Sequence, residues 1–353
     1  MLIYLVSPHV GPSGRGNAVT VERLRAGLEA RGVAARVLLP EDCPGAGPRP
    51  DIVHAFHAGH SGPAALSLAS ELHVPLVVTL TGTDYNEELD EPVAAERVRR
   101  VLREARAVIG FSQGCAEHVV ARLPELVSTL RVIPQAPFVQ GWTRPPCVRL
   151  ARRPEAFTVL HLAGIRPVKS NLSAVAPLER LRARLPGLRL VFAGPALDAG
   201  YAERLSRRIA GLSWCRYAGE LPRASIPGAL AEADVVLNTS VSEGMANAVL
   251  EAMWWGCPVI AHDVPGNREL VAHEVTGLLY AGEAALEQCV ERLAREPELA
   301  VRLASAARAR VDERYSPAAE LDAHLELYRR LLGERGRLLP GVRACPDGSS
   351  LIL

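Results

Sequence analysis

Residues 242–267, SEGMANAVLEAMWWGCPVIAHDVPGN, contain a loop, a helix and a strand in one continuous stretch. The preceding run ADVVLNTS predicts a strand, residues 246–255 predict a helix, and CPVIAHD predicts the next strand. A strand, a helix and a second strand in this order form a βαβ unit, whose strands lie parallel in one sheet. The stretch therefore predicts an α/β fold with ligand-binding loops at the carboxyl ends of its strands.

The same alternation extends over most of the chain. Before the quoted stretch, the following apolar runs each predict a strand: LIYLVS, ARVLLP, DIVHAF, PLVVTL, AVIGFS, LRVIP, FTVLHLAG and LRLVFAG. The pattern stops between residues 135 and 154, where four prolines and no apolar period indicate a linker. We therefore predict two Rossmann-like, doubly wound parallel-sheet domains. The predicted parts are a first domain over 1–140, a linker over 141–155, a second domain over 156–315, a helix over 316–332 that could cross back to the first domain, and a loose tail over 333–353.

Composition and charge exclude several classes of protein. Of the 353 residues, 48% are hydrophobic, which is enough for a core in each of two domains. The 40 basic and 39 acidic residues balance, so no nucleic-acid binder is indicated. Residues 96–106 could contact an anionic membrane, but we favour a solvated helical face. With no signal peptide, no apolar run of about 18 residues and no CxxC pair among seven cysteines, we predict a cytoplasmic protein with reduced thiols.

A glycine-rich loop follows the first predicted strand. In SPHVGPSGRGNAVT, Gly11, Gly14 and Gly16 precede a helix, so their backbone could approach an anion at the helix N-terminus. The alternative is a flexible turn capped by Asn17. The spacing is not GxGxxG, so a dinucleotide site is not supported.

Three histidines follow the strand DIVHAF at positions 54, 57 and 60. Alternate residues of a strand face opposite sides, so we expect His54 and His57 to point apart. No carboxylate stands near them in the sequence after Asp51, so we predict no metal site here. His57 is the histidine that we expect at the ligand-binding edge.

Polar and charged residues follow two further strands. Residues 81–84, TGTD, place hydroxyls and the Asp84 carboxylate where they could bind sugar hydroxyls, or could simply begin a helix. Arg166 and Lys169 follow the first strand of the second domain and precede a helix. Two cations at a helix entrance suit a diphosphate, although a solvated charged turn is the alternative.

The two glutamates of the quoted stretch are the strongest functional signal. Glu243 precedes the predicted helix and Glu251 lies about two turns inside it. Free N–H groups at the helix N-terminus, around Ala246 and Asn247, would draw a phosphate, while Glu243 could accept from sugar hydroxyls. Glu251 could accept from the vicinal diol of a ribose. Sugar, diphosphate and ribose together describe a nucleotide sugar.

The motif SEGMANAVLEAM…CPVIAHDVPGNRELV…EVTGLL resembles the donor-site signature of the family 4 glycosyltransferases, which have the GT-B fold with two domains facing a cleft. GNAVT at 16–20, GTDYNE at 82–87 and RPVK at 166–169 resemble a subgroup of that family, the glycosyltransferase 1 domain-containing proteins, and also bacterial selenosugar synthases. The resemblance implies that Arg166 and Lys169 neutralise the diphosphate, that Glu243 holds the sugar and that Glu251 binds the ribose. The other donor-binding residues that it implies are Gly14, Gly16, Asn17, Gly164, Glu220, Leu221, Gly244, Met245, Ala246 and Asn247.

The chain departs from the family pattern at one position. Many members carry a histidine just before a GTD-like segment, where this chain has Thr81, so His57 or Asp84 would have to replace it. No Asp-x-Asp metal motif is present, so we predict transfer that needs no metal and no cofactor. The resemblance implies a hexosyltransferase that retains the anomeric configuration. It would use a UDP-sugar and a small-molecule or lipid-linked acceptor. Selenosugar synthase-like transfer to selenophosphate, UDP-sugar 2-epimerisation and nucleotide-sugar binding without turnover remain the alternatives.

Overall fold

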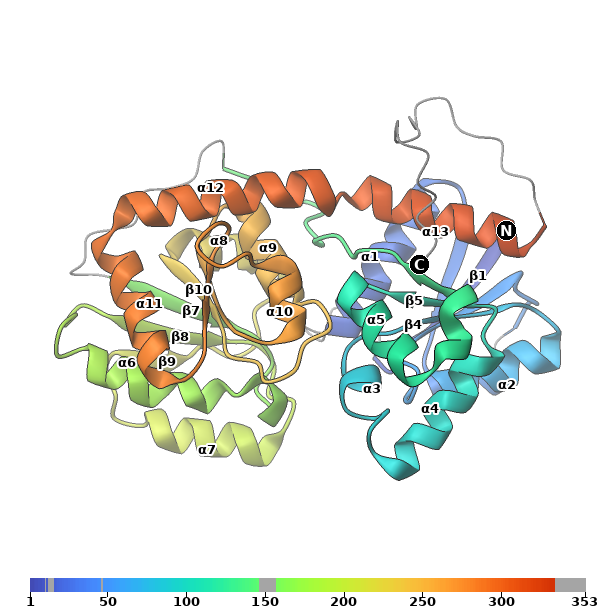
Figure 1. Cartoon of the computed structure of the whole chain (residues 1–353), viewed down its shortest axis with the longest axis horizontal. Helices are drawn as coiled ribbons and strands as arrows, with labels where there is room; N and C mark the ends of the chain where they lie inside the picture. The colour runs from blue at the N-terminus through green and yellow to red at the C-terminus, as the bar shows by residue number, and fades with distance from the viewer. Residues whose placement is uncertain (10, 12–15, 46, 146–156, 334–353) are drawn as a thin grey trace. The chain divides into compact units, whose positions relative to one another are not determined.

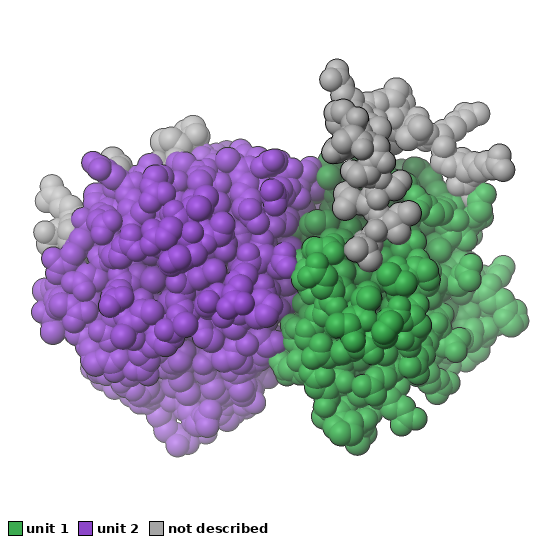
Figure 2. All heavy atoms as spheres, in the orientation of Figure 1, with its two compact units in different colours: residues 1–10, 21–135, 317–353 green, residues 11–20, 136–316 purple. Residues whose placement is uncertain are grey.

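The computed structural model describes residues 1–9, 11, 16–45, 47–145 and 157–333. These residues form two compact units, coloured separately in Figure 2. The first unit contains residues 1–10, 21–135 and 317–353, and the second contains residues 11–20 and 136–316. Residues 11–20 thus group with the second unit, which differs from a first domain over 1–140. Most of the predicted linker and tail lies outside the described residues.

The first unit, which contains the strands labelled β1, β4 and β5 in Figure 1, is built on a parallel sheet. The strand order of this sheet is β2-β1-β3-β4-β5-β6. Its strands are β1 (Leu2–Val6), β2 (Ala34–Leu38), β3 (Ile52–Phe56), β4 (Leu76–Thr79), β5 (Ala107–Gly110) and β6 (Leu130–Val132). Its helices are α1 (Gly16–Ala30, of which the first residues group with the second unit), α2 (Gly62–Leu72), α3 (Thr83–Asn86), α4 (Pro92–Glu104), α5 (Gln113–Arg122) and α13 (Pro317–Leu331).

Both faces of this first sheet are covered, as a doubly wound fold requires. Ile52 and Phe56 of β3 pack in one core cluster with residues of α1 and α13, and Val53 and Ala55 pack in another with residues of α2, α4 and α5. The strands are buried on both sides, which explains why they are continuous apolar runs in the sequence.

Polar contacts hold α13, which is part of the first unit, against β3 and α1. His54 is fully buried, with one ring nitrogen 2.6 Å from the Tyr328 hydroxyl and the other 2.7 Å from the Thr79 hydroxyl. Arg23 of α1 forms two hydrogen bonds, of 2.8 and 2.7 Å, to Glu320 of α13. His54 is therefore part of the internal packing between β3 and α13.

The second unit has its own parallel sheet in the order β12-β11-β10-β7-β8-β9. Its strands are β7 (Thr158–Leu162), β8 (Arg189–Ala193), β9 (Cys215–Tyr217), β10 (Val235–Asn238), β11 (Val259–His262) and β12 (Leu278–Tyr280). Its remaining helices are α6 (Val175–Leu181), α7 (Ala199–Ile209), α8 (Ile226–Glu232), α9 (Asn247–Trp255), α10 (Pro265–Leu270), α11 (Glu283–Arg295) and α12 (Pro297–Arg314). The sequence analysis did not identify β9 and β12, which are only three residues long.

Each sheet has a position at which its strand order reverses. In the second unit this switch point lies between β7 and β10, and in the first it lies between β1 and β3. Ligands of open α/β sheets bind beyond the carboxyl ends of the strands at such points. Arg166 and Lys169 follow β7, Glu243 follows β10, and His57 follows β3, so these predicted site residues lie where binding is expected.

Among the described helices, none combines the length and the apolar character that crossing a membrane requires. The described cysteines, at positions 43, 115, 215, 257 and 289, are buried free thiols.

Candidate functional site

The loops after β7 and β10 meet at the switch point of the second unit. The Val241 N–H donates to the Val168 carbonyl over 3.0 Å, which joins the two loops through their backbones. Next to this contact, Lys169 Nζ lies 2.6 Å from Glu243 Oε1. The structure therefore brings together two predicted site residues that are far apart in the sequence.

Glu243 is almost fully buried and is held by three donors. Besides Lys169, the Ser240 hydroxyl donates to Oε1 over 2.6 Å and the Asn238 amide donates to it over 3.1 Å. Burial alone would raise the pKa of the Glu243 carboxyl, but the Lys169 charge and these hydrogen bonds hold it below its ordinary value. Glu243 is therefore an ionised acceptor at a fixed position.

Lys169 is the single lysine in a chain whose other basic side chains, histidine aside, are all arginine. Its side chain is 18% exposed, so a ligand can reach the ammonium group while it contacts Glu243. An ammonium is a compact point charge with three donors, unlike the planar guanidinium. Lys169 can therefore bridge Glu243 and an anionic ligand.

A layer of amides lies behind Glu243. The Asn238 side-chain oxygen accepts from the Ser240 N–H over 3.0 Å and from the Asn267 amide over 3.1 Å. A side chain at Gly266 would place Cβ 2.2 Å from the Glu243 carbonyl oxygen, so glycine is required there. The PGN part of the quoted motif thus supports the Glu243 loop from behind.

A buried histidine supports the Lys169 loop. The Thr239 hydroxyl lies 2.7 Å from the Lys169 carbonyl and 2.7 Å from His161 Nε2. Because the hydroxyl proton is directed to a carbonyl, the imidazole must donate from Nε2. Burial lowers the pKa of His161 to about 4, so the ring is neutral at physiological pH. Neutral His161 therefore fixes the backbone that carries Lys169.

Helix α9 begins directly after the Glu243 loop. Ala246 occupies the N-cap position without a side-chain hydrogen bond to the first turn, and Gly244 and Met245 before it are buried. The Asn247 amide donates over 3.3 Å to the Gly16 carbonyl, and both residues group with the second unit. The first turn of α9 is thus placed beside Glu243, as the sequence analysis assumed.

Glu251, inside α9, contacts a residue that the sequence analysis did not single out. Only 2% of its side chain is exposed, and its Oε1 lies 2.8 Å from Nη1 of Arg223. Arg223 begins a short 3-10 helix (Arg223–Ser225) two residues after Leu221. The guanidinium lies over the rings of Trp142 at 4.8 Å and Phe138 at 5.2 Å.

The other predicted donor-site residues lie around the same loops, except for Gly14, which is outside the described residues. Arg166 is half-buried, and its N–H donates to the Asn171 side chain over 3.3 Å. Gly164 packs so closely that a Cβ would come 2.5 Å from Leu197. Glu220 is exposed, whereas Leu221 and Asn17 are half-buried.

In the first unit, the Asp84 carboxylate is fully buried and accepts from backbone donors. The N–H groups of Ala58, Thr81 and Gly82 donate to it over 2.9 to 3.2 Å. Gly82 has φ 139°, a backbone conformation that side chains rarely adopt. Asp84 therefore ties the loops after β3 and β4 together, and its oxygens face backbone N–H groups.

His57 lies at the end of β3 in a cluster with His60 and Glu88. Its Nδ1 accepts from the His60 N–H over 3.1 Å, and its Nε2 lies 2.9 Å from the Thr83 hydroxyl. Burial lowers the pKa of His57 despite the nearby Asp84 charge. Glu88 Oε1 lies 3.6 Å from His57 and 3.4 Å from His60. We expected no carboxylate near these histidines. That expectation is wrong, because Glu88, from a later loop, lies beside them in the folded chain.

The ligand atoms of His57, His60 and Glu88 all lie within 4.8 Å of one another, as metal ligands would. The two rings, however, are stacked in parallel at 4.0 Å, so their nitrogen lone pairs do not converge on one point. His57 Nδ1 also accepts from a backbone N–H, which leaves the proton of the neutral ring on Nε2. In this arrangement the cluster is unsuited to an ion.

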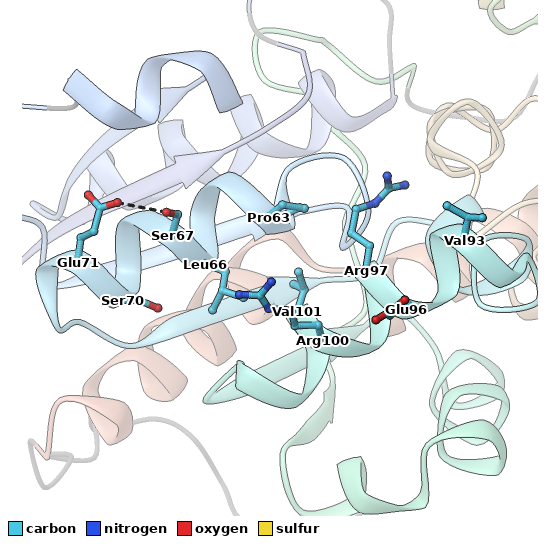
Figure 3. A pocket seen from close by; sticks show the side chains of 10 residues that line it. All are labelled: Pro63, Leu66, Ser67, Ser70, Glu71, Val93, Glu96, Arg97, Arg100 and Val101. Atoms are coloured by element: carbon cyan, nitrogen blue, oxygen red, sulfur yellow. Dashed lines mark hydrogen bonds between the residues drawn. The ribbon is translucent and has the colours of Figure 1, made fainter.

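A groove of about 590 Å³ lies between α2 and α4 of the first unit (Figure 3). Its lining mixes apolar residues such as Leu66 and Val101 with two glutamates and two arginines, Arg97 and Arg100. Opposite charges balance there, and none of the predicted site residues lines it.

Two family profiles match the chain. The profile for Glycosyl transferases group 1 matches residues 156–296, and that for the Glycosyl transferase 4-like domain matches residues 43–134. The D-inositol 3-phosphate glycosyltransferase of Pseudarthrobacter chlorophenolicus is 31% identical over 316 residues, which cover 83% of this chain and 74% of that protein. The chain belongs to the group 1 glycosyltransferases. The enzyme class predicted from the motifs is thereby confirmed.

Two further likenesses agree with this family. Glycosyltransferase 1 domain-containing protein 1 of Xenopus tropicalis is 28% identical over 265 residues, which cover 73% of this chain and 77% of that protein. The crystal structure of Anabaena HepE in complex with UDP-glucose matches with a TM-score of 0.75 and 19% identity, over 93% of this chain and 99% of that chain. At this identity the structural likeness shows the fold, and it confirms the predicted two-domain α/β class.

Several residues of the candidate site were not predicted from the sequence. His161, Asn238, Ser240 and Asn267 form the layer behind Lys169 and Glu243, and Arg223 contacts Glu251. A usable signal existed for three of them, since Asn238 and Ser240 end a strand and Asn267 lies in the quoted motif. His161 and Arg223 carried no such signal.

Proposed function

We propose that this glycosyltransferase takes its sugar from a UDP-sugar and transfers it, with retention, to a small-molecule or lipid-linked acceptor. The observation that carries the proposal is the Lys169–Glu243 contact of 2.6 Å at the switch point of the second unit. It sets a reachable cation and an ionised acceptor side by side, which matches the junction of a diphosphate and a sugar. The UDP-glucose complex of the related Anabaena protein supports a UDP-sugar, and retention rests on the family resemblance.

The proposed reaction needs charge neutralisation where the sugar–phosphate bond breaks. As the bond to the anomeric carbon breaks, negative charge develops on the diphosphate. Lys169, Arg166 and the N-terminus of α9 would stabilise that charge, the last through its partial positive charge and N–H groups. Glu243 would hold the sugar hydroxyls. These groups could replace a divalent cation, so we propose that transfer requires no metal.

The donor is tested by binding and by product analysis. We expect UDP and UDP-glucose to raise the melting temperature, since a ligand at 100 times its Kd stabilises the native state by about 2.7 kcal/mol. Incubation with UDP-sugars, with and without acceptor extracts, should give a new glycoside and free UDP, and the anomeric proton in an NMR spectrum reports retention. A changed sugar at C2 would instead indicate an epimerase, transfer to added selenophosphate a selenosugar synthase, and binding without products a protein that has lost turnover.

The site itself can be tested through the single lysine. The Lys169 ammonium and the α-amino group are the only primary amines of the sequence, so an acylating reagent has two targets that mass spectrometry resolves. We expect saturating UDP to protect Lys169 and to leave acylation of the α-amino group unchanged. Equal labelling of Lys169 with and without UDP would contradict the phosphate assignment.

Metal independence is tested with a chelator. UDP release is expected to survive EDTA at full rate. Complete loss in EDTA that magnesium or manganese restores would refute it, and a His60→Ala variant would then show whether the His57, His60 and Glu88 cluster supplies the ligands.

A further inference from the structure

We infer that Arg223 is a positioning residue of the donor site, which holds the Glu251 carboxylate ready for the hydroxyls of the donor's ribose. The inference rests on the proposed function, because it deepens the role of Glu251 in binding a UDP-sugar. Arg223 is identified from its contacts in the structure, because nothing in the sequence after β9 pointed to it.

Glu251 is buried, and its carboxylate therefore needs a cation beside it. With 2% of its side chain exposed, a carboxylate at this position is strongly disfavoured unless a cation accompanies it. Arg223 supplies that cation at 2.8 Å from Oε1. An ionised carboxylate only accepts hydrogen bonds, which is what the two hydroxyls of a diol require, and the adjacent arginine balances its charge.

Two aromatic rings and a backbone carbonyl hold the Arg223 guanidinium in place. Its guanidinium lies over Trp142 and Phe138, at 4.8 and 5.2 Å from the two ring centres, and it also donates to the Phe138 carbonyl. A planar cation within about 6 Å of an aromatic face is attracted to it. The two rings and the carbonyl therefore fix the direction from which the guanidinium approaches Glu251, and the carboxylate is fixed in turn.

The consequence is that recognition of the ribose depends on Arg223 as much as on Glu251. A freely rotating or protonated Glu251 would still fit in the site, but it would lose its preference for a ribose with both hydroxyls. The base and the diphosphate would be bound as before. Removing Arg223 should therefore lower the affinity for UDP more than it lowers the affinity for the deoxy analogues.

The test is calorimetric titration of UDP, 2′-deoxy-UDP and 3′-deoxy-UDP into the full chain. A hydrogen bond to a charged group contributes about 1.5–3 kcal/mol, so the wild type should prefer UDP by about 10- to 100-fold over at least one analogue. In Arg223→Ala and in Glu251→Gln this ratio should fall to within about threefold of one. The double variant should be no worse than either single variant, since both remove the same interaction.

Two further variants control for structure. Arg182 lies over Trp214 at 5.5 Å and donates to the Pro186 carbonyl, so Arg182→Ala removes a similar arginine–tryptophan contact away from Glu251 and should leave the ratio unchanged. Arg223→Lys keeps the charge but not the planar fork, so it should fold and give an intermediate ratio even where Arg223→Ala does not fold.

The outcomes separate the two proposals. If the wild type binds neither UDP nor UDP-glucose, the proposed donor is wrong and the role of Arg223 is overturned with it. If the wild type discriminates among the nucleotides and the foldable Arg223 variants keep its ratio within twofold, the role of Arg223 alone is overturned.

Discussion

The strand-end loops of the two units use a buried carboxylate in opposite ways. In the second unit Glu243 accepts from a lysine, a hydroxyl and an amide, all side-chain groups at the mouth of a site. In the first unit Asp84 accepts from three backbone N–H groups and closes its own loop. Both carboxylates come shortly after a buried strand, Glu243 before α9 and Asp84 in the first turn of α3. A position after a strand therefore makes an acidic residue a candidate for ligand binding, and the groups that donate to its carboxylate decide between ligand binding and loop structure.

The first prediction breaks the side-chain cluster of the second unit. Lys169→Met should lower sugar transfer by about 10- to 100-fold, because a charge-assisted contact to the diphosphate is lost. It should also destabilise the protein by about 3–5 kcal/mol, since Glu243 is left buried without its cation. Steady-state kinetics and thermal unfolding measure the two effects.

A double variant separates activity from stability at this site. Lys169→Met with Glu243→Gln removes the uncompensated charge, so melting should recover while transfer stays low. Lys169→Arg keeps the charge but changes its shape and should recover only part of the rate. Near-normal transfer in Lys169→Met would contradict the assignment of the site.

The second prediction concerns acid and the histidine behind Lys169. The pKa of His161 is about 4 in the folded protein, against 6.5 for a free histidine, because the ring is buried. Between these values the unfolded chain binds a proton that the folded chain does not, so stability falls as pH is lowered from 6.5 to about 4. The loss attributable to His161 should reach about 3 kcal/mol and be absent above pH 6.5.

Tryptophan fluorescence makes this measurement specific to the second unit. All four tryptophans, at positions 142, 214, 254 and 255, belong to that unit, so their fluorescence reports on the unit that contains His161. The buried His54 and His324 belong to the first unit. In His161→Gln the pH-dependent part between 6.5 and 4 should shrink. An unchanged pH dependence in this variant would show that another group carries it.

The sequence was a good guide to the fold and a partial guide to the site. Long apolar runs such as that of β7 predicted their strands, whereas β9 and β12, at three residues each, were not identified from the sequence. Lys169 and Glu243 were both expected near the donor because each follows a strand. That they touch depends on β7 lying beside β10, and strand order is set by packing of the whole sheet.

Contacts between distant loops could not be predicted from the sequence either, because they too depend on how the strands are ordered in the sheet. Glu251 was assigned from its spacing to Glu243, but the Arg223 that contacts it comes from the loop after β9, an unidentified strand. Asp84 was left open between sugar binding and the start of a helix, because nothing in TGTD shows that three N–H groups turn toward its carboxylate. Glu88 joined His57 and His60 only once the later loop was placed in space.

The smallest expected effect concerns Asp84, the buried loop carboxylate of the first unit. Asp84→Asn replaces one acceptor oxygen by an NH₂ group, so at least one of the N–H groups of Ala58, Thr81 and Gly82 should lose its partner. We expect a loss of stability of about 1.5–3 kcal/mol, confined to the first unit, with hydrogen exchange faster at these three positions. Glu91→Gln alters an exposed carboxylate that accepts from the Ala94 N–H, and it should cost less. Tryptophan fluorescence of the second unit should be unchanged in both variants. If Asp84→Asn instead melts normally and loses turnover with an altered pH profile, then Asp84 serves the reaction directly, and the contrast with Glu243 disappears.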